Sequence, residues 1–170
     1  MKFYFDDPEV GPDRETSHPD FVSKFTAEIY YDVLDEFSPF GNDDGADALS
    51  NLEDWYRDTD GEEDIMEWLF EYIDDFGFEY ASRDVYLLTD KSKLEAIRKK
   101  EPFLLQSMDN TIIAAAFGQY KMTGEINEEL KQAALLSIAR TKMIPSQDRT
   151  PLLNEFTKNY SQMESDLAKL

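Results

Sequence analysis

The segment from Glu62 to Phe76 places a large apolar side chain at nearly every third or fourth position. On a helix these side chains form one stripe, and the acidic residues between them form a second stripe on the other side. The apolar stripe contains Ile65, Trp68, Leu69, Tyr72, Ile73 and Phe76. This spacing predicts an amphipathic helix with one buried face, and it argues against a disordered acidic tail, which would carry few large apolar residues.

Helical spacing continues through most of the chain. Helices are expected to begin near Pro19, Ala46, Glu62, Asp90, Asp109 or Asn110, Asn127 and Thr150. The first should run to about Glu36, and in the last Thr150 is the expected N-cap, with Pro151 at the first helical position. Residues 2–5 and 85–88 are candidate short strands that could pair with each other. We therefore expect a mostly α fold, a single-domain helical bundle of about seven helices with at most a minor two-stranded β element.

The 170 residues show no composition break that would mark a linker, so we expect one domain over 1–170. Within it, residues 1–17 form a strand and loop lead-in, 18–77 form an acidic helical half, and 78–170 form a near-neutral helical half. The formal charge of −20 follows this division, because residues 1–80 carry a net −21 and residues 81–170 a net +1. Such a charge asymmetry indicates which partners the protein can bind and how soluble it is, but it does not determine the fold.

The acidic excess excludes several classes of partner. Direct binding to DNA or RNA depends on Lys and Arg that neutralise phosphates, so no direct nucleic-acid partner is expected. An anionic membrane surface is unfavourable for the same reason. The segment from Met1 to Asp7 lacks the pattern of a signal peptide, and the longest apolar run, Ile112 to Phe117, is six residues. These features predict a cytoplasmic protein that does not enter the membrane.

Most catalytic chemistry is missing from the sequence. The chain has no cysteine, which excludes disulfides, thiol catalysis and thiolate metal sites. Its one histidine, His18, lies in a turn before a helix, where a structural or capping role is expected. None of the glycines forms a phosphate-binding loop. We therefore predict a non-enzymatic protein without a cofactor, a catalytic residue or a metal ligand.

One acidic stretch partly matches a calcium-binding loop, and this alternative stays open. With Gly61 at the sixth position, suitable acids occupy the third, fifth, seventh, ninth and twelfth positions, namely Asp58, Asp60, Glu62, Asp64 and Glu67. The first position is Tyr56, where a ligand Asp belongs, and the eighth is Glu63, where an apolar residue belongs. The match is weak evidence, because a segment this rich in acids places carboxylates at suitable positions by chance.

The acidic helix and the turn before it are instead the predicted partner-binding surface. Neighbouring acids on a helix repel one another, and a merely solvated face would normally include Lys to relieve this. The candidate residues are Trp55, Tyr56, Asp58, Asp60, Glu62, Glu63, Asp64, Glu67, Trp68, Glu71, Asp74 and Asp75. The three aromatic residues are candidate anchors, although Tyr56 and Trp68 also fit the apolar stripes of their helices and so could belong to the core.

Two stretches resemble a small group of bacterial YfeS-like proteins. The first runs from Asp35 to Leu49 (DEFSPFGNDDGADAL) and is followed by Trp55 and Tyr56, and the second is MDNTIIAAAFGQ at 108–119. The likeness extends over about residues 18–145. It implies a bacterial origin and transfers no catalytic or binding residue, because the group is uncharacterised. In physical type the chain is also similar to the immunity proteins of bacterial toxin systems, which are small, often acidic, cytoplasmic and non-enzymatic.

These observations favour an acidic protein that binds a basic protein. The leading hypothesis is an immunity protein that occupies the active-site cleft of a nuclease-type toxin, as in contact-dependent growth inhibition or polymorphic toxin systems. The alternative is a DNA mimic that inhibits a DNA-binding or restriction enzyme, whose carboxylates would follow an extended ridge. An uncharacterised calcium-binding or enzymatic domain is the third hypothesis.

Overall fold

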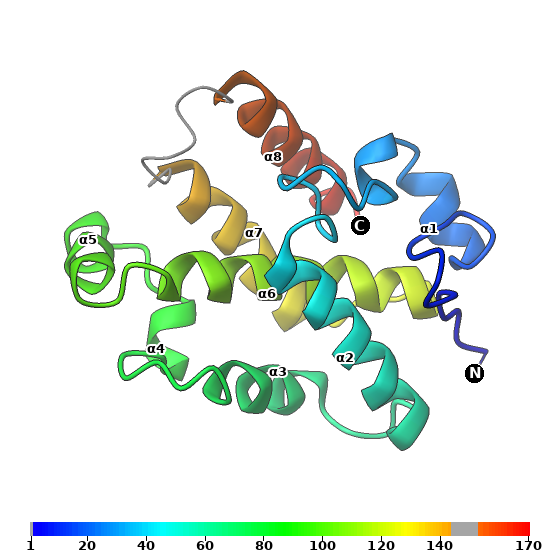
Figure 1. Ribbon diagram of the computed structural model, residues 1–170, viewed down its shortest axis with the longest axis horizontal. Helices are drawn as coiled ribbons and strands as arrows, with labels where there is room; N and C mark the ends of the chain where they lie inside the picture. Colours follow the sequence, from blue (N-terminus) through cyan, green and yellow to red (C-terminus); the bar gives the residue numbers. More distant parts are fainter. Residues whose placement is uncertain (1, 144–152) are drawn as a thin grey trace.

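The computed structural model describes residues 2–143 and 153–170, and this part of the chain is helical (Figure 1). Its elements are α1 (Pro19–Lys24), the 3-10 helix η1 (Glu28–Tyr30), α2 (Asp43–Thr59), α3 (Ile65–Asp74), α4 (Arg83–Tyr86), α5 (Lys91–Lys100), α6 (Leu104–Thr123), α7 (Glu128–Met143) and α8 (Leu153–Leu167). The described residues contain eight α-helices and no β-strand. The predicted mostly α class is confirmed.

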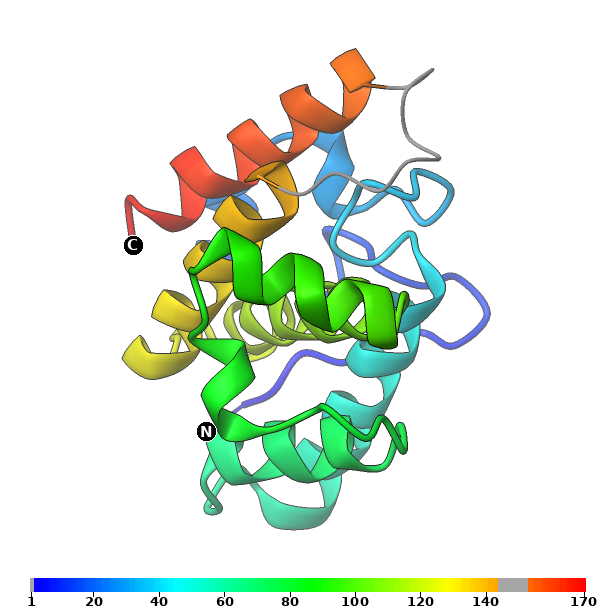
Figure 2. The same ribbon diagram turned by 90° about the vertical axis from the view of Figure 1, so that its left-hand side faces the viewer.

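Helix α6 crosses the middle of the molecule and contacts α1, α2, α3, α5 and α7 (Figure 1). It is apolar around most of its circumference, and nearly all of its residues are buried. A helix of this kind must be covered on every side. Small residues allow the close approach, because a Cβ added at Gly118 would lie 3.1 Å from Leu49 and 3.3 Å from Leu52 of α2. Helices α2 and α3 lie on one side of α6, and α8 lies on the other (Figures 1 and 2).

Helices α2 and α3 form because their apolar residues face α6 and their ends are capped. The side chain of Asn42 accepts a hydrogen bond from the Gly45 N–H at 2.8 Å and starts α2. Asp64 accepts one from the Met66 N–H at 2.9 Å and starts α3. Between them, Asp60 ends α2 in the left-handed conformation, with a φ of 53°. The two helices are thereby joined by a short, capped turn.

Two ion pairs tie α6 to segments far away in the sequence. Arg140 of α7 and Asp109 of α6 pair in the interior, and Arg140 Nη1 also donates to the carbonyl oxygens of Val85 (2.9 Å) and Tyr86 (2.7 Å) at the end of α4. Burial raises the pKa of Asp109, while Arg140 acts in the opposite direction. Near the other end of α6, the fully buried Lys121 pairs with Asp6 at 2.7 Å.

The predicted helix from Pro19 to Glu36 is wrong beyond its first turns. Helix α1 ends at Lys24, a 3-10 turn follows, and the chain then runs as bends and turns to Asn42. The carboxylate of Asp32 accepts a hydrogen bond from the Leu34 N–H at 2.8 Å, and that of Asp35 accepts one from the Phe37 N–H at 2.9 Å. Such short-range bonds compete with helical ones. They leave Leu34, which would lie on the apolar stripe of a helix running to Glu36, 91% exposed.

Three smaller expectations also need correction or fall outside the described residues. Residues 2–5 do not pair as a strand with 85–88; Tyr4 N–H donates to the Met122 carbonyl at 3.1 Å, and α4 contains Val85 and Tyr86. Asp109 and Asn110 do not cap a helix, because α6 begins earlier, at Leu104. The helix start predicted at Thr150 and Pro151 lies outside the described residues. The expected starts at Asp90 and Asn127 are confirmed by their capping hydrogen bonds.

Replacing Arg140 with alanine should lower the free energy of unfolding by about 3–5 kcal/mol, because Asp109 would stay buried without its ionic partner. Urea unfolding followed by far-ultraviolet circular dichroism measures this change. Lys142→Ala is a matched control on the same helix, since it removes a more exposed pair with Glu164 and should cost at most about 1 kcal/mol. Equal effects of the two substitutions would contradict a special role for Arg140.

Candidate functional site

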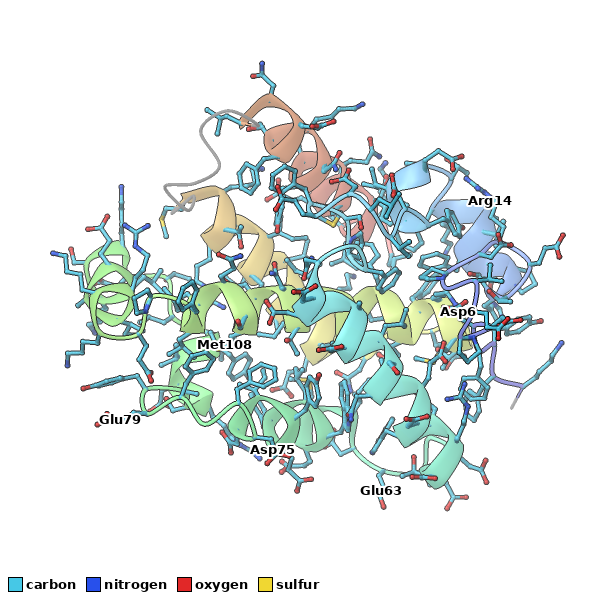
Figure 3. The ribbon with its side chains drawn as sticks, viewed as in Figure 1. Asp6, Arg14, Glu63, Asp75, Glu79 and Met108 are labelled. Atoms are coloured by element: carbon cyan, nitrogen blue, oxygen red, sulfur yellow. The ribbon has the colours of Figure 1, made fainter. Side chains whose placement is uncertain are left out.

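The acidic residues predicted to bind a partner lie together on the α2–α3 hairpin and its connections. All nine are exposed: Asp58, Asp60, Glu62, Glu63, Asp64, Glu67, Glu71, Asp74 and Asp75. Figure 3 shows Glu63 and Asp75 on the same edge of the molecule, with their side chains directed away from the body. The fold therefore gathers these carboxylates on one edge. We call the surface that they form the acidic edge.

Two basic side chains lie close to the acidic edge, and both are already paired. Arg57 donates to Glu53 at 2.9 Å and to Asp54 at 2.7 Å. Arg83 forms two hydrogen bonds with Glu67, at 2.9 Å and 2.5 Å, and these bonds lower the pKa of the Glu67 carboxyl. Among the described residues, no basic group lies within ion-pair distance of the remaining eight acids of the acidic edge. Most of its charge is therefore available to a partner.

The three aromatic candidates differ in how much surface they present. Tyr56 is 4% exposed and Trp68 is 7% exposed, so both belong to the core, as their places in the apolar stripes indicated. The Tyr56 hydroxyl accepts a hydrogen bond from Gln119 at 3.1 Å, and Trp68 Nε1 donates to Asn51 at 3.0 Å. Trp55 is only partly buried and contacts both rings. It is thus the one of the three with ring surface open to solvent.

Tyr72 is a partly exposed ring, although the helical spacing places it in the apolar stripe of α3. It stacks on Trp68 with ring centroids 5.7 Å apart and an interplanar angle of 11°. Burial raises the pKa of its hydroxyl, and the carboxylates of Asp47 and Asp44 add to this effect. The helical period placed Tyr72 within the apolar stripe, so nothing in the sequence indicated its exposure. Trp55 and Tyr72 together supply aromatic surface next to the acidic edge.

The residues of the possible calcium loop have other structural roles. Asp64 caps α3, and Glu67, at the position of the bidentate ligand, pairs with Arg83. Gly61 follows Asp60 in the turn with a φ of +70°, a conformation that glycine adopts without strain. Within residues 2–143 and 153–170, no group of three or more acidic or histidine side chains is arranged to hold a metal ion.

A basic segment lies apart from the acidic edge. Helix α5 faces the viewer in Figure 2, whereas the α2–α3 hairpin lies at the lower edge of the same view. The basic residues of α5 are Lys91, Lys93, Arg98, Lys99 and Lys100. Further acids lie in the lead-in and in the turns up to Glu36, so the acidic surface also extends around the N-terminal side. The molecule is consequently dipolar, and its end at α5 is positive.

A search of curated proteins finds a relative in Escherichia coli (strain K12), described as uncharacterized protein YfeS. The two are 39% identical over 145 residues, which is 84% of this chain and 57% of the relative. The chain is YfeS-like. The resemblance predicted from residues 35–49 and 108–119 is thus confirmed, and the chain spans less than two thirds of the length of YfeS. The description of YfeS gives no activity, so the similarity assigns no functional residue.

The other comparisons add no functional assignment. No protein-family model matches the YfeS-like chain, and no solved structure matches it. In the part of the chain that the structure describes, none of the helices combines the length and apolarity needed to cross a bilayer.

The melting temperature should rise when NaCl is increased from about 10 mM to about 150 mM, because the screening length falls from about 30 Å to about 8 Å. Repulsion within the acidic edge would then weaken, and each 1 kcal/mol gained would raise the melting temperature by roughly 2–4 °C in a protein of this size. Differential scanning fluorimetry measures the change. The variant E62Q/E63Q/E71Q/D74N should show a smaller rise, and a flat or falling curve for the unmodified protein would contradict this prediction.

Proposed function

We propose that this protein is a non-enzymatic inhibitor whose acidic edge binds a basic protein, and specifically an immunity protein that occludes the active-site cleft of a nuclease-type bacterial toxin. The toxin would belong to a contact-dependent growth inhibition or polymorphic toxin system. The observation that carries the proposal is the acidic edge itself, in which eight of nine exposed carboxylates lack a basic partner among the described residues.

The electrostatic argument begins with the partner. A nuclease binds a polyanion, so its cleft is lined by positive charge, and a fixed negative surface can occupy that cleft and exclude the substrate. Complementary charge also accelerates association, up to roughly 10⁸–10⁹ M⁻¹s⁻¹ for strongly steered pairs. Rapid capture suits an inhibitor of a toxin that acts catalytically, because every free toxin molecule turns over many substrates.

The rigidity of the hairpin supports the same proposal. Trp68 of α3 donates a hydrogen bond to Asn51 of α2, and both helices pack on the buried α6. Helices held on a fixed frame lose little backbone entropy when a partner binds. Binding energy in protein interfaces is concentrated in a few well-packed anchors, which are often aromatic. Trp55 and Tyr72 are the rings placed to serve in this way.

A DNA mimic would rely on the same charges but would need carboxylates spaced like phosphates along an extended ridge. Here the acids cluster around a two-helix hairpin joined by a short turn. We therefore favour the toxin inhibitor. The identity of a captured partner distinguishes this hypothesis from the DNA mimic.

Capture from a nuclease-treated lysate of the native host, followed by an activity assay, tests the proposal. The protein should retain a basic nuclease domain and should inhibit its cleavage of RNA or DNA at a one-to-one ratio. The variant E62K/E63K/E71K/D74K should reduce the association rate at least about tenfold, because steering is lost. A matched control, E15K/E36K/E125K/E155K, reverses four exposed acids outside the acidic edge and should change the rate much less.

Two outcomes would count against the immunity function. Recovery of restriction or other DNA-processing enzymes would favour the DNA mimic. Equal loss of binding in the two charge-reversed variants would show that total charge matters and that the acidic edge does not.

A further inference from the structure

A cleft of about 460 Å³ lies between the N-terminal loop and α2, and none of its lining residues is an acid of the acidic edge. Its apolar wall includes Val33, Phe40 and Leu49. Of these, Val33 remains 44% exposed, whereas Phe40 and Leu49 are buried. The cleft is thus large enough for a small organic molecule and offers it an apolar side.

The remaining wall of the cleft is strongly acidic. Its carboxylates come from Asp6, Asp7, Asp43, Glu53 and Asp54, and its only basic lining residue within the described chain is Arg57. These acids come from two parts of the sequence, the N-terminal loop and α2, which the fold brings together. A negative wall beside an apolar wall favours an organic cation over an anion or a neutral molecule.

Asp6 brings an incompletely paired carboxylate to the wall of the cleft. Its side chain is only 8% exposed, and its Oδ1 accepts hydrogen bonds from Lys121 at 2.7 Å and Thr16 at 2.5 Å. Its Oδ2 is buried and accepts no hydrogen bond from any described residue. A buried carboxylate oxygen without a donor is costly and rare in native proteins. Asp6 is among the residues that line the cleft, so a cation held there would lie beside this carboxylate.

Glu53 is a desolvated carboxylate in a wall that also contains exposed acids, namely Asp7, Asp43 and Asp54. It is 6% exposed, and its carboxylate accepts hydrogen bonds from the Asp6 N–H and from Arg57, both at 2.9 Å. Burial raises the pKa of Glu53, and the nearby Asp6 carboxylate adds to the effect. A second cation in the cleft would stabilise the ionised form of this side chain.

Arg57 shows that carboxylates of the cleft wall pair with a guanidinium group. Its guanidinium bridges Glu53 and Asp54 and lies over the Phe5 ring, 4.4 Å from the centroid. Planar, weakly hydrated guanidinium groups suit this combination of carboxylates and apolar surface better than a compact ammonium does. A metal ion suits it less, because Val33, Phe40 and Leu49 cannot coordinate one.

We propose that this cleft binds a guanidinium group on an aliphatic stem, with the cation against Asp6, Asp7 and Asp43 and the stem against Val33 and Phe40. The ligand is either a small free guanidine or an arginine side chain of a protein. The proposal goes beyond the toxin-inhibitor function and does not depend on it, because the site needs no acid of the acidic edge.

Isothermal titration of the full chain with butylguanidinium, in about 150 mM NaCl, tests the site. We expect a dissociation constant of about 1 mM or lower. Butylurea has nearly the same shape without the charge and should bind at least about tenfold more weakly, because the carboxylates would lose their ionic partner. The double variant D7N/D43N, which changes two exposed acids and should leave the fold intact, should weaken butylguanidinium binding by a similar factor.

The matched control E62Q/E63Q removes two charges outside the cleft and should leave the affinity unchanged within about twofold, since screening limits long-range effects. A second titration, with a capped Gly-Gly-Arg-Gly-Gly peptide, separates the two sources. Binding of the peptide as tight as that of butylguanidinium would indicate a protein side chain, and binding of butylguanidinium alone would indicate a free guanidine. Absence of binding to both probes, or equal weakening in D7N/D43N and E62Q/E63Q, would overturn the proposal.

Discussion

The buried pair between Asp109 and Arg140 holds together three helices that are distant in the sequence. A charge inside a protein must be paired and hydrogen-bonded, because its loss of hydration costs several kcal/mol. Arg140 meets this requirement with one carboxylate and three carbonyl oxygens, those of Val85, Tyr86 and Leu88. A single side chain therefore links α7 both to α6 and to the end of α4. At the far end of α6, Lys121 and Asp6 fix the N-terminal lead-in in the same way.

This arrangement has a consequence for the acidic hairpin. Since α6 is apolar on nearly every side, α2 and α3 must turn their apolar stripes toward it, and their carboxylates then point outward. The acidic edge is thus the solvent face of helices whose inner faces are needed by the core. Repulsion among its carboxylates is tolerated because burial of residues such as Leu52 and Leu69 stabilises the same helices. A preformed negative surface of this kind suits the proposed capture of a basic partner.

The helical spacing of apolar residues predicted the elements well where the local hydrogen bonds and the packing against the core both favour a helix. Helix α3 with its acidic stripe follows from local spacing, and the helix starts at Asp90 and Asn127 follow from capping. The failure at Pro19 to Glu36 has a definite cause. Phe21, Phe25 and Tyr30 do reach the core, but short-range bonds from Asp32 and Asp35 turn the chain away from a helix. Helical spacing alone does not distinguish these two outcomes.

The sequence by itself determined the helical class, the acidic excess of the first 80 residues and the likeness to YfeS, because these depend on composition, local spacing and residue identity. Only the tertiary structure decided that Tyr56 and Trp68 are buried while Trp55 stays partly open. It alone also brought Asp6 to Lys121, 115 positions away, and so built the acidic cleft against α2. Contacts of this kind depend on how helices pack around α6. The periodic pattern shows which face of a helix is buried, but it does not show which element covers that face.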